Sequence, residues 1–357
     1  MKPFLPLLLG LCALLSCQRE TPSVKPSGNP STPVGVPAFA RGADISWVSE
    51  MEHDGRTFKK KDGSKADIFD VLKEVGINAI RLRVWVNPSG GWSGKDDVVA
   101  LGKRAAAAGM ALMVDFHYSD FFADPGRQTV PEAWKGDTGD LAKMIVHVKE
   151  HTTEVLTALK EAGVTPAWVQ IGNETAGGML WPTGEHGKEG GWENFVRLYN
   201  AGYDAAKAVF PDILAMPHLN NAYKDNAWWF EKLKTLGGKM DMIALSHYPQ
   251  GASDPEACNS QAVSRIQSLS AAYGVKVMVS EVGVKTRAGE AKAKSFLATF
   301  MSGVKALDGC AGVFYWEPEV DGVWKPAVYT SLGWNAYDMG AFTTDGRATS
   351  VLDCFTE

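Results

Sequence analysis

The feature that most restricts the fold of this chain is a repeated joint between a helical pattern and an apolar run. Gly76, Gly109, Gly163 and Gly274 each end a segment with helical spacing of apolar residues, and each is followed at once by a short strand-like run. Glycine closes a helix at this place because it adopts the left-handed conformation without a Cβ clash. Four such joints in one chain predict repeating βα units.

The runs after these joints belong to a larger set of eight, and they are apolar on both faces, as expected for parallel strands covered by helices. The predicted strands are Ala40–Trp47, Ala79–Val86, Ala111–His117, Ala167–Gly172, Ile213–His218, Met242–His247, Val275–Glu281 and Ala311–Trp316. This alternation predicts an α/β fold, a single (β/α)8 TIM barrel with long loops at the carboxyl ends of its strands. An open doubly wound sheet is the alternative. It is disfavoured because no glycine-rich dinucleotide turn follows the first strand.

Composition and charge are those of one large globular domain and argue against a nucleic-acid partner. The chain has 357 residues, of which 45% are hydrophobic, with a net charge of -5 and a pI of about 5.9. Nucleic-acid binders usually carry a basic excess, so no nucleic-acid partner is expected. A chain of this length buries its own core, and a monomer is therefore expected.

The first residues resemble an export signal rather than part of the fold. Met1 and Lys2 give a positive start, and the apolar run Leu5–Leu15 is too short to span a membrane. Leu14-Leu15-Ser16-Cys17 resembles a bacterial lipobox, in which the cysteine becomes the lipidated first residue. The prediction is a signal peptide at 1–16, a disordered Pro- and Ser-rich tether at 17–37 and a catalytic domain at 38–357, lipid-anchored through Cys17 at the bacterial cell surface or outer membrane. A plain signal peptide with an incidental cysteine is the alternative.

Two predicted strands end in a carboxylate. Val169-Gln170-Ile171-Gly172 runs into Asn173 and Glu174, and Val277-Met278-Val279-Ser280 runs into Glu281. These are the fourth and seventh strands, which face one another across the mouth of a barrel, so the two carboxyl groups can converge. A retaining glycosidase needs two carboxyl groups roughly 5–5.5 Å apart, one as nucleophile and one as acid and base. A structural ion pair is the alternative for either glutamate alone.

Other polar residues at strand ends are candidates for the same pocket. Arg83 is the candidate cation that keeps Glu281 ionised, with Arg81 assigned a structural role. Asn173 is expected to donate a hydrogen bond to a sugar hydroxyl. His117, His247 and Tyr248 also end strands and are candidates to line the sugar site. A histidine in such a position is often only a satisfied structural residue.

Aromatic and sulfur side chains add weaker signals. Tryptophans in the predicted catalytic-face loops are candidate sugar platforms, namely Trp92, Trp181 and Trp324, with Trp134 and Trp334 in the same loops. Cys258, Cys310 and Cys354 remain outside the export segment. Only Cys310 and Cys354 are both expected at the lower end of the barrel, so theirs is the pair whose topology would allow a disulfide. None of the three has metal-ligand spacing, and no His-Glu-x-x-His motif is present.

Several motifs together resemble the arabinogalactan endo-β-1,4-galactanases of glycoside hydrolase family 53, in the large superfamily of retaining barrels with catalytic residues on strands four and seven. The resemblance covers residues 38–355. The Asn-Glu pair marks only the superfamily, whereas His117-Tyr118-Ser119-Asp120 with Ala123-Asp124-Pro125 is more family-specific. The matching stretches are 41–46, 78–85, 115–120, 123–125 with Gln128, 170–174, 245–249 and 314–318.

The resemblance implies endo-acting, retaining hydrolysis of β-1,4-galactan, the side chain of type I arabinogalactan in pectin. It implies Glu174 as acid and base, Glu281 as nucleophile and Trp316 as a sugar platform. Related barrels often have a cis bond after this tryptophan, which predicts a cis peptide at Trp316–Glu317. Some members hold calcium in a long loop after strand seven. Here Val282–Gly289 is short and lacks an acidic cluster, so no cofactor is expected, although Glu319, Asp321 and Asp338 in the next loop leave calcium possible.

Three alternatives remain open. Another β-1,4-glycanase of the superfamily, such as a mannanase or cellulase, would use the same two glutamates. A surface glycan-binding lipoprotein would keep the tryptophans but would not need both carboxylates. A metal-dependent hydrolase would need clustered ligands, whereas the seven histidines are scattered.

Overall fold

The barrel sheet contains nine strands rather than eight, because the fifth predicted strand is broken at Pro217. The structure is a computed structural model, and it describes Met1 and residues 35–249, 252–286 and 289–356. Its parallel strands, in chain order, are β1 (Ala40–Asp44), β4 (Ala79–Val84), β5 (Ala111–Phe116), β6 (Trp168–Ile171), β9 (Leu214–Met216), β10 (His218–Leu219), β11 (Met242–His247), β12 (Lys276–Val282) and β13 (Cys310–Trp316).

Pro217 separates two halves of one strand position and lets them pair with different neighbours. β9 pairs with β6, and β10 pairs with β11, so β9 and β10 are the two ends of the sheet order. The gap between them is bridged, since Ala244 N donates to Pro217 O at 2.9 Å. The sheet is therefore closed, as the predicted (β/α)8 barrel requires.

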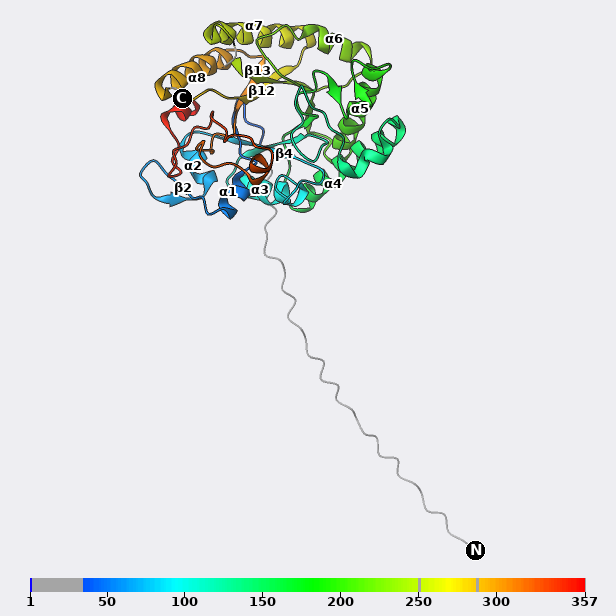
Figure 1. Ribbon diagram of the computed structural model, residues 1–357, viewed down its shortest axis with the longest axis horizontal. Coiled ribbons are helices and arrows are strands. Elements are labelled where there is room, and N and C mark those ends of the chain that lie inside the picture. The colour runs from blue at the N-terminus through cyan, green and yellow to red at the C-terminus, as the bar shows by residue number, and fades with distance from the viewer. Residues whose placement is uncertain (2–34, 250–251, 287–288, 357) are drawn as a thin grey trace. The chain divides into compact units, whose positions relative to one another are not determined.

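Helices surround the strands (Figure 1). They are α1 (Val48–His53), α2 (Ile68–Glu74), α3 (Lys95–Ala107), α4 (Leu141–Glu161), α5 (Gly191–Val209), α6 (Ala227–Thr235), α7 (Pro255–Tyr273), α8 (Glu290–Lys305) and α9 (Ala327–Ser331). The four predicted helix-closing glycines all have positive φ, from 66° at Gly274 to 87° at Gly76. In the last βα unit a 3-10 helix at Ser350–Phe355 takes the place of an α-helix.

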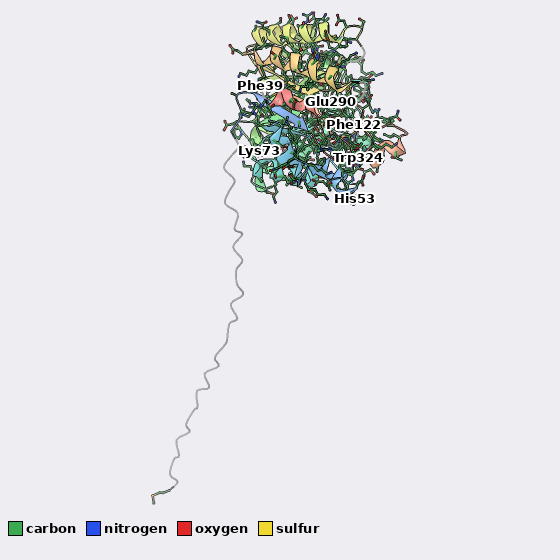
Figure 2. The ribbon with its side chains drawn as sticks, turned by 90° about the vertical axis from the view of Figure 1, so that its left-hand side faces the viewer. Phe39, His53, Lys73, Phe122, Glu290 and Trp324 are labelled. Atoms are coloured by element: carbon green, nitrogen blue, oxygen red, sulfur yellow. The ribbon has the colours of Figure 1, made fainter. Side chains whose placement is uncertain are left out.

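The loops contain two short hairpins and a 3-10 helix. β2 (Phe58–Lys59) pairs with β3 (Lys65–Ala66), and β7 (Gly178–Met179) pairs with β8 (Gly184–Glu185) in the loop after β6. A 3-10 helix at Glu132–Asp137 lies in the loop after β5. In the side view, Phe39 at the amino end of β1 and Trp324 in the loop after β13 lie on opposite sides of the barrel (Figure 2).

The floor of the barrel is apolar and the layer above it is charged. Trp168 and Phe314 meet edge to face at 6.1 Å, packed among buried methionine and alanine side chains. Gly42 makes room for this packing, because a Cβ there would lie 2.1 Å from the Phe314 ring. Above this floor, Arg81 and Asp115 are fully buried. The strand ends therefore carry a polar layer on a solid support.

The cysteines do not form the suggested bridge. Cys310 is a buried free thiol whose Sγ donates to Gly312 O, and Cys354 Sγ donates to Val351 O. The suggested Cys310–Cys354 disulfide is therefore wrong. The predicted signal peptide, Cys17 and most of the tether fall within residues 2–34, outside the described residues. Within the described part of the chain, no helix is long and apolar enough to cross a membrane.

Candidate active site

One cleft of about 300 Å³ opens at the carboxyl ends of the strands. Its walls come from strand ends and from the loops after β5, β6, β11 and β13. Both glutamates singled out in the sequence, Glu174 and Glu281, line it. The other lining residues are His117, Phe122, Ala123, Asp124, Asn173, Tyr248, Trp316, Tyr329, Trp334 and Met339.

Glu281 is held by one cation and one phenol. Arg81 Nη2 donates to Glu281 Oε1 at 2.8 Å, and Tyr248 Oη donates to Oε2 at 2.9 Å. A register shift between β11 and β12 pairs Glu281 with Ser246, after Val279 has paired with Leu245. Such a bulge re-aims a side chain, and here it lies directly before the cleft-lining carboxylate.

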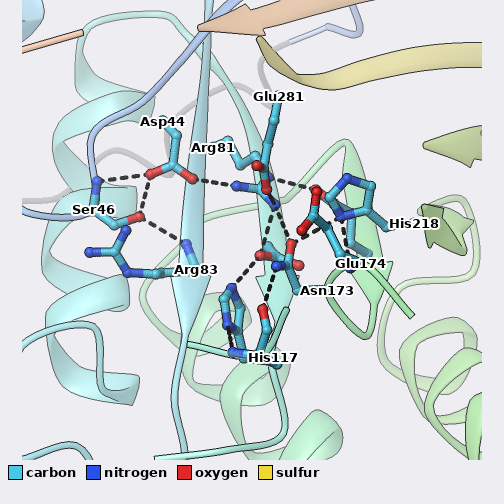
Figure 3. A network of polar contacts seen from close by, with 12 residues as sticks. Asp44, Ser46, Arg81, Arg83, His117, Asn173, Glu174, His218 and Glu281 are labelled. Carbon is cyan, nitrogen blue, oxygen red and sulfur yellow. Dashed lines mark hydrogen bonds and ion pairs between the residues drawn. The ribbon is translucent and has the colours of Figure 1, made fainter. Parts of the chain in front are cut away.

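The cation beside Glu281 is Arg81, so the assignment of Arg83 to this position is wrong. Arg83 is 1% exposed, donates to Glu317 at 2.8 Å and lies over the Trp47 ring at 4.1 Å. Arg81 also donates to Asp44 at 2.6 Å and to Asp115 at 2.8 Å. Figure 3 shows Arg81 between Asp44 and Asn173 and close to Glu281, with Arg83 turned to the other side. The staggered strands, rather than position in the sequence, decide which arginine meets Glu281.

Glu174 lies in a different environment from Glu281. It follows a Gly172 with φ 87° and itself has φ 46°, so the chain turns sharply at the end of β6. Burial raises the pKa of Glu174 to about 8, the charge of Glu281 adds to this effect, and a hydrogen bond from Ser246 opposes it. Burial also raises the pKa of Glu281, to about 7, and Arg81 is the largest opposing influence. The first proton taken up by the pair therefore belongs on Glu174.

Asn173 is fixed by its neighbours. Its Oδ1 accepts from Arg81 at 3.0 Å and lies 2.9 Å from His218 Nδ1, while its Nδ2 donates to Ala123 O at 2.8 Å. The bond to Ala123 uses one of the two hydrogens on Asn173 Nδ2. The direction of the other hydrogen is set, because these contacts fix the plane of the side-chain amide. His218 Nε2 in turn lies 2.8 Å from Ser246 Oγ.

Sequence reasoning missed His218 and Ser246. Both are buried and connect Asn173 to Glu174 through hydrogen bonds. The available signal was a polar residue next to the end of an apolar run: His218 ends the fifth predicted strand and Ser246 precedes His247 in the sixth. Many strand ends carry such residues, and only the closed barrel shows that these two meet.

His117 lies in the cleft in a defined tautomer. Its Nδ1 accepts from Ala123 N at 3.0 Å, so Nε2 is the nitrogen that donates to Asp115, 2.8 Å away. Burial lowers the pKa of His117, which keeps the ring neutral. Burial opposes ionisation of Asp115, but Arg81 and His117 hold its pKa at about 2. Neutral His117 and ionised Asp115 therefore form a hydrogen-bonded pair at the floor of the cleft.

His247 does not line the cleft, contrary to the expectation from sequence. It is fully buried, its Nε2 lies 2.8 Å from Asn259 of α7, and its ring stacks on Phe300 of α8 at 4.4 Å. Successive side chains of a strand point to opposite faces, so Ser246 faces the barrel interior and His247 faces the helices. Tyr248, the next residue, returns to the cleft.

Trp316 ends β13 and lines the cleft, where its ring meets Tyr337 edge-on at 4.8 Å. The predicted cis bond after it is wrong. Among the described residues, the cis peptide is Trp181–Pro182. The chain leaves β13 instead through Glu317, which has φ 52° and is fully buried in its ion pair with Arg83.

The loop tryptophans fall into different surroundings. Trp334 lines the cleft, Trp181 lines a separate groove with Arg127 and Gln128, and Trp92 packs beside His53. Trp324 is 9% exposed and donates to Asp54, and Trp134 is 7% exposed. Trp324 is therefore part of the core of its loop and not an open platform.

Metal ligands are sparse. In the described ranges, no group of three or more His, Cys, Asp or Glu side chains could hold a metal ion. In the sequence, the segment between β12 and α8 contains no carboxylate, the side-chain ligand that calcium prefers.

A parallel barrel with two glutamates that converge on one cleft from the ends of its fourth and seventh strands defines the class: a glycoside hydrolase. Comparison with known sequences agrees with this class. The family model described as glycosyl hydrolase family 53 matches residues 40–355, and the chain belongs to that family.

Named relatives and solved structures extend the match over most of the chain. An arabinogalactan endo-beta-1,4-galactanase of Thermothelomyces thermophilus is 30% identical over 339 residues, covering 88% of this chain and 98% of the relative. The structure of a fungal beta-1,4-galactanase superposes with a TM-score of 0.77 at 29% identity, covering 90% of this chain and 100% of the other. The Ignisphaera aggregans GH53 catalytic domain also gives 0.77 at 29% identity, covering 91% and 98%.

Proposed function

We propose that this protein is an endo-acting β-1,4-galactanase that hydrolyses the galactan of type I arabinogalactan with retention at the anomeric carbon. The observation that carries the proposal is the unequal glutamate pair in one cleft. Glu281 has Arg81 and Tyr248 on its two oxygens, whereas Glu174 has the higher pKa. The substrate class rests on family membership and on the galactanase relatives.

In this mechanism Glu281 attacks the anomeric carbon while Glu174 protonates the leaving oxygen. A covalent glycosyl-enzyme forms, and Glu174, now ionised, removes a proton from the water that hydrolyses it. Arg81 and Tyr248 favour the ionised form of Glu281 and align its carboxylate. Fixed donors around the sugar become more favourable as charge develops in the transition state, since they need no reorganisation.

Four further residues are proposed to bind the substrate. Asn173 and His117 offer polar groups at the base of the cleft, Tyr248 contacts the nucleophile, and Trp316 presents an aromatic ring at its side. Flat apolar sugar faces pack well against such rings. No cofactor is needed for this chemistry, because both catalytic groups are carboxyl side chains.

Release of reducing sugar from linear β-1,4-galactan tests the proposal. Wild-type protein and the Glu281→Ala variant are assayed side by side, with glucomannan and carboxymethylcellulose as control substrates. Activity on galactan alone, reduced roughly 10⁴-fold or more in the variant, is expected when a covalent catalyst is removed. Activity on mannan or cellulose instead would keep the mechanism and replace the substrate. Tight binding of galactan without hydrolysis would indicate a glycan-binding protein.

We also propose that the protein is exported and anchored by a lipid on Cys17 at the bacterial cell surface or outer membrane, and that it acts as a monomer. The lipobox-like Leu14-Leu15-Ser16-Cys17 supports the anchor. The expected result is membrane-fraction activity in cells that is released to the soluble fraction by Cys17→Ser. Equal distribution of both forms would contradict the anchor.

A further inference from the structure

A second cavity, of about 610 Å³, lies apart from the catalytic cleft, whose volume is about 300 Å³. It is open to solvent, and its walls come from the loop after β4, the start of α3, the 3-10 helix after β5 and the middle of α4. Its lining residues are Val86, Asn87, Pro88, Gly91, Gly94, Lys95, Asp96, Trp134, His147, Glu150, His151 and Glu154. The two sets of lining residues have no member in common.

One buried nitrogen in this cavity lacks a hydrogen-bond partner. His151 is 7% exposed and lines the cavity, and its Nε2 has no partner among the described residues. Burial lowers the pKa of His151 to about 4, so the ring is neutral and can exchange one hydrogen bond with a hydroxyl. A buried polar atom without a partner costs free energy, and a ligand that supplies one recovers it.

The rest of the lining is rich in acceptors for hydroxyl groups. Asp96, Glu150 and Glu154 contribute carboxylates, and Lys95 forms an ion pair with Glu154 between α3 and α4. Hydroxyl groups bind ionised carboxylates through charge-assisted hydrogen bonds. Trp134 adds an aromatic wall, stacked on His147 with ring centroids 5.0 Å apart.

This lining favours a neutral polyhydroxylated ligand over the other chemical classes. Three carboxylates disfavour a phosphate or an acidic chain. A metal ion is disfavoured because the described residues offer no group of three or more side chains that could hold one. The volume lies within the ~300–1,000 Å³ range of small-ligand pockets.

The cavity and the cleft are both lined by the loop that follows β5. The loop after β5 supplies Trp134 to the cavity and Phe122, Ala123 and Asp124 to the cleft. The strand before the other loop, β4, carries Arg81, which binds Glu281. A polysaccharide bound in the cavity would therefore stay on the side where cleavage occurs.

We propose that this cavity is a second carbohydrate-binding site that holds a remote segment of the galactan chain while another segment is cleaved. The proposal rests on galactan being the substrate. Holding the polymer raises its local concentration at the cleft through a second point of attachment. Short oligosaccharides cannot occupy both places, so only the polymer gains from the site.

Two variants of the cavity test this proposal. Glu150→Ala/Glu154→Ala removes two acceptors, and Asn87→Trp fills the cavity. Glu161→Ala, an exposed acidic residue on α4 outside the lining, is the matched control. Retardation in native gels containing linear galactan is measured in a Glu281→Ala background, so that the polymer is not consumed. Steady-state kinetics on galactan and on galactotetraose are measured with the nucleophile present.

Glu150→Ala/Glu154→Ala is expected to weaken binding in the gel at least about tenfold, the effect of losing one hydrogen bond to a charged group. Asn87→Trp, which occupies the cavity, is expected to weaken binding by at least as much. KM for the polymer should rise while kcat and the kinetics on galactotetraose stay unchanged, which also shows that the fold is intact. The control should match the parent. Unchanged retardation and KM in both cavity variants would overturn the second site. Absence of galactan hydrolysis by the wild type would instead overturn the proposed function.

Discussion

At the scale of single residues, the chemistry depends on neighbouring side chains that give two similar carboxyl groups different pKa values. Glu281 meets Arg81 and Tyr248, whereas Glu174 meets the Ser246 hydroxyl and the charge of Glu281. Both are buried, so a nearby guanidinium has a large effect on ionisation. The same two side chains in water would titrate almost together. The protein separates their roles by placing one cation beside one of them.

The first prediction concerns the proton on Glu174. Its pKa of about 8 means that kcat/KM falls as pH rises through that value, because ionised Glu174 has no proton to donate to the leaving oxygen. Glu174→Ala should lose roughly 10²–10⁴-fold in kcat/KM on galactan and much less on an aryl galactoside with a good leaving group. On the aryl substrate the decline at high pH should disappear. An unchanged alkaline limb in the variant would assign that limb to another group.

The second prediction compares the two arginines of β4. Arg81 lowers the pKa of Glu281, so replacing it should raise that pKa and move the acid limb of the pH–rate profile to higher pH. Arg81→Lys is expected to show this shift and to lose roughly 10²-fold in kcat, since a lysine cannot maintain several directed contacts. Arg83→Lys is the matched control and should leave the acid limb in place. The same shift in both variants would contradict the assignment.

At the scale of elements, irregularities in strands place the site residues. The register shift in β12 aims Glu281 into the cleft, and the break at Pro217 leaves His218 to start β10. In a regular strand, successive side chains point to opposite faces of the sheet, and the register shift and the break interrupt this alternation. Close packing behind the strands then fixes their positions. Gly202 of α5 is an example, because a Cβ there would lie 2.6 Å from Tyr118 Oη and 2.7 Å from Ile171 Cγ2.

The third prediction follows from this contact. Gly202→Ala should reduce the free energy of unfolding by about 1–3 kcal/mol, although alanine favours helices, because the added methyl group overpacks the interface between α5 and β6. Gly136→Ala, where nothing lies within 4 Å of an added Cβ, is the control and should change stability little. Urea denaturation measures both. A stabilised Gly202→Ala variant would show that the backbone moves freely there.

At the scale of the whole molecule, the barrel is held by packing and buried hydrogen bonds. Strand contacts close the sheet, and an apolar floor around Trp168 and Phe314 supports the charged layer above it. Cys310 and Cys354 lie buried and are not joined to one another. Stability therefore comes from burial of apolar surface rather than from a covalent link between the last strand and the end of the chain.

The fourth prediction tests this source of stability. Dithiothreitol should leave the melting temperature and the galactanase activity unchanged, since no bond between Cys310 and Cys354 is available for reduction. Differential scanning calorimetry with and without the reductant gives the answer, and Cys310→Ser serves as the control. A decrease of several degrees on reduction, absent in Cys310→Ser, would reveal a disulfide in the folded protein.

Features of this site that depend on local sequence could be predicted, and features that depend on long-range contacts could not. The approximate strand positions and the convergence of Glu174 and Glu281 on one cleft were predictable. They depend on local signals, namely the spacing of apolar residues, the glycines that end helices and the residues that end strands. The role of Arg81 was not predictable, since Arg81 and Arg83 alternate to the same side of β4 and only the folded barrel shows which of them meets Glu281. His247 was misplaced because a one-residue difference reverses the side of a strand.

The sequence alone therefore determined the alternating βα order, the barrel class and the two carboxyl groups at its mouth. These follow from the spacing of apolar residues and from which residue comes last in a strand. Only the tertiary structure decided which cation meets Glu281, that His218 and Ser246 join Asn173 to Glu174, and that Cys310 and Cys354 are not joined to one another. Those contacts join residues far apart in the chain, and the stagger and closure of the barrel bring them together.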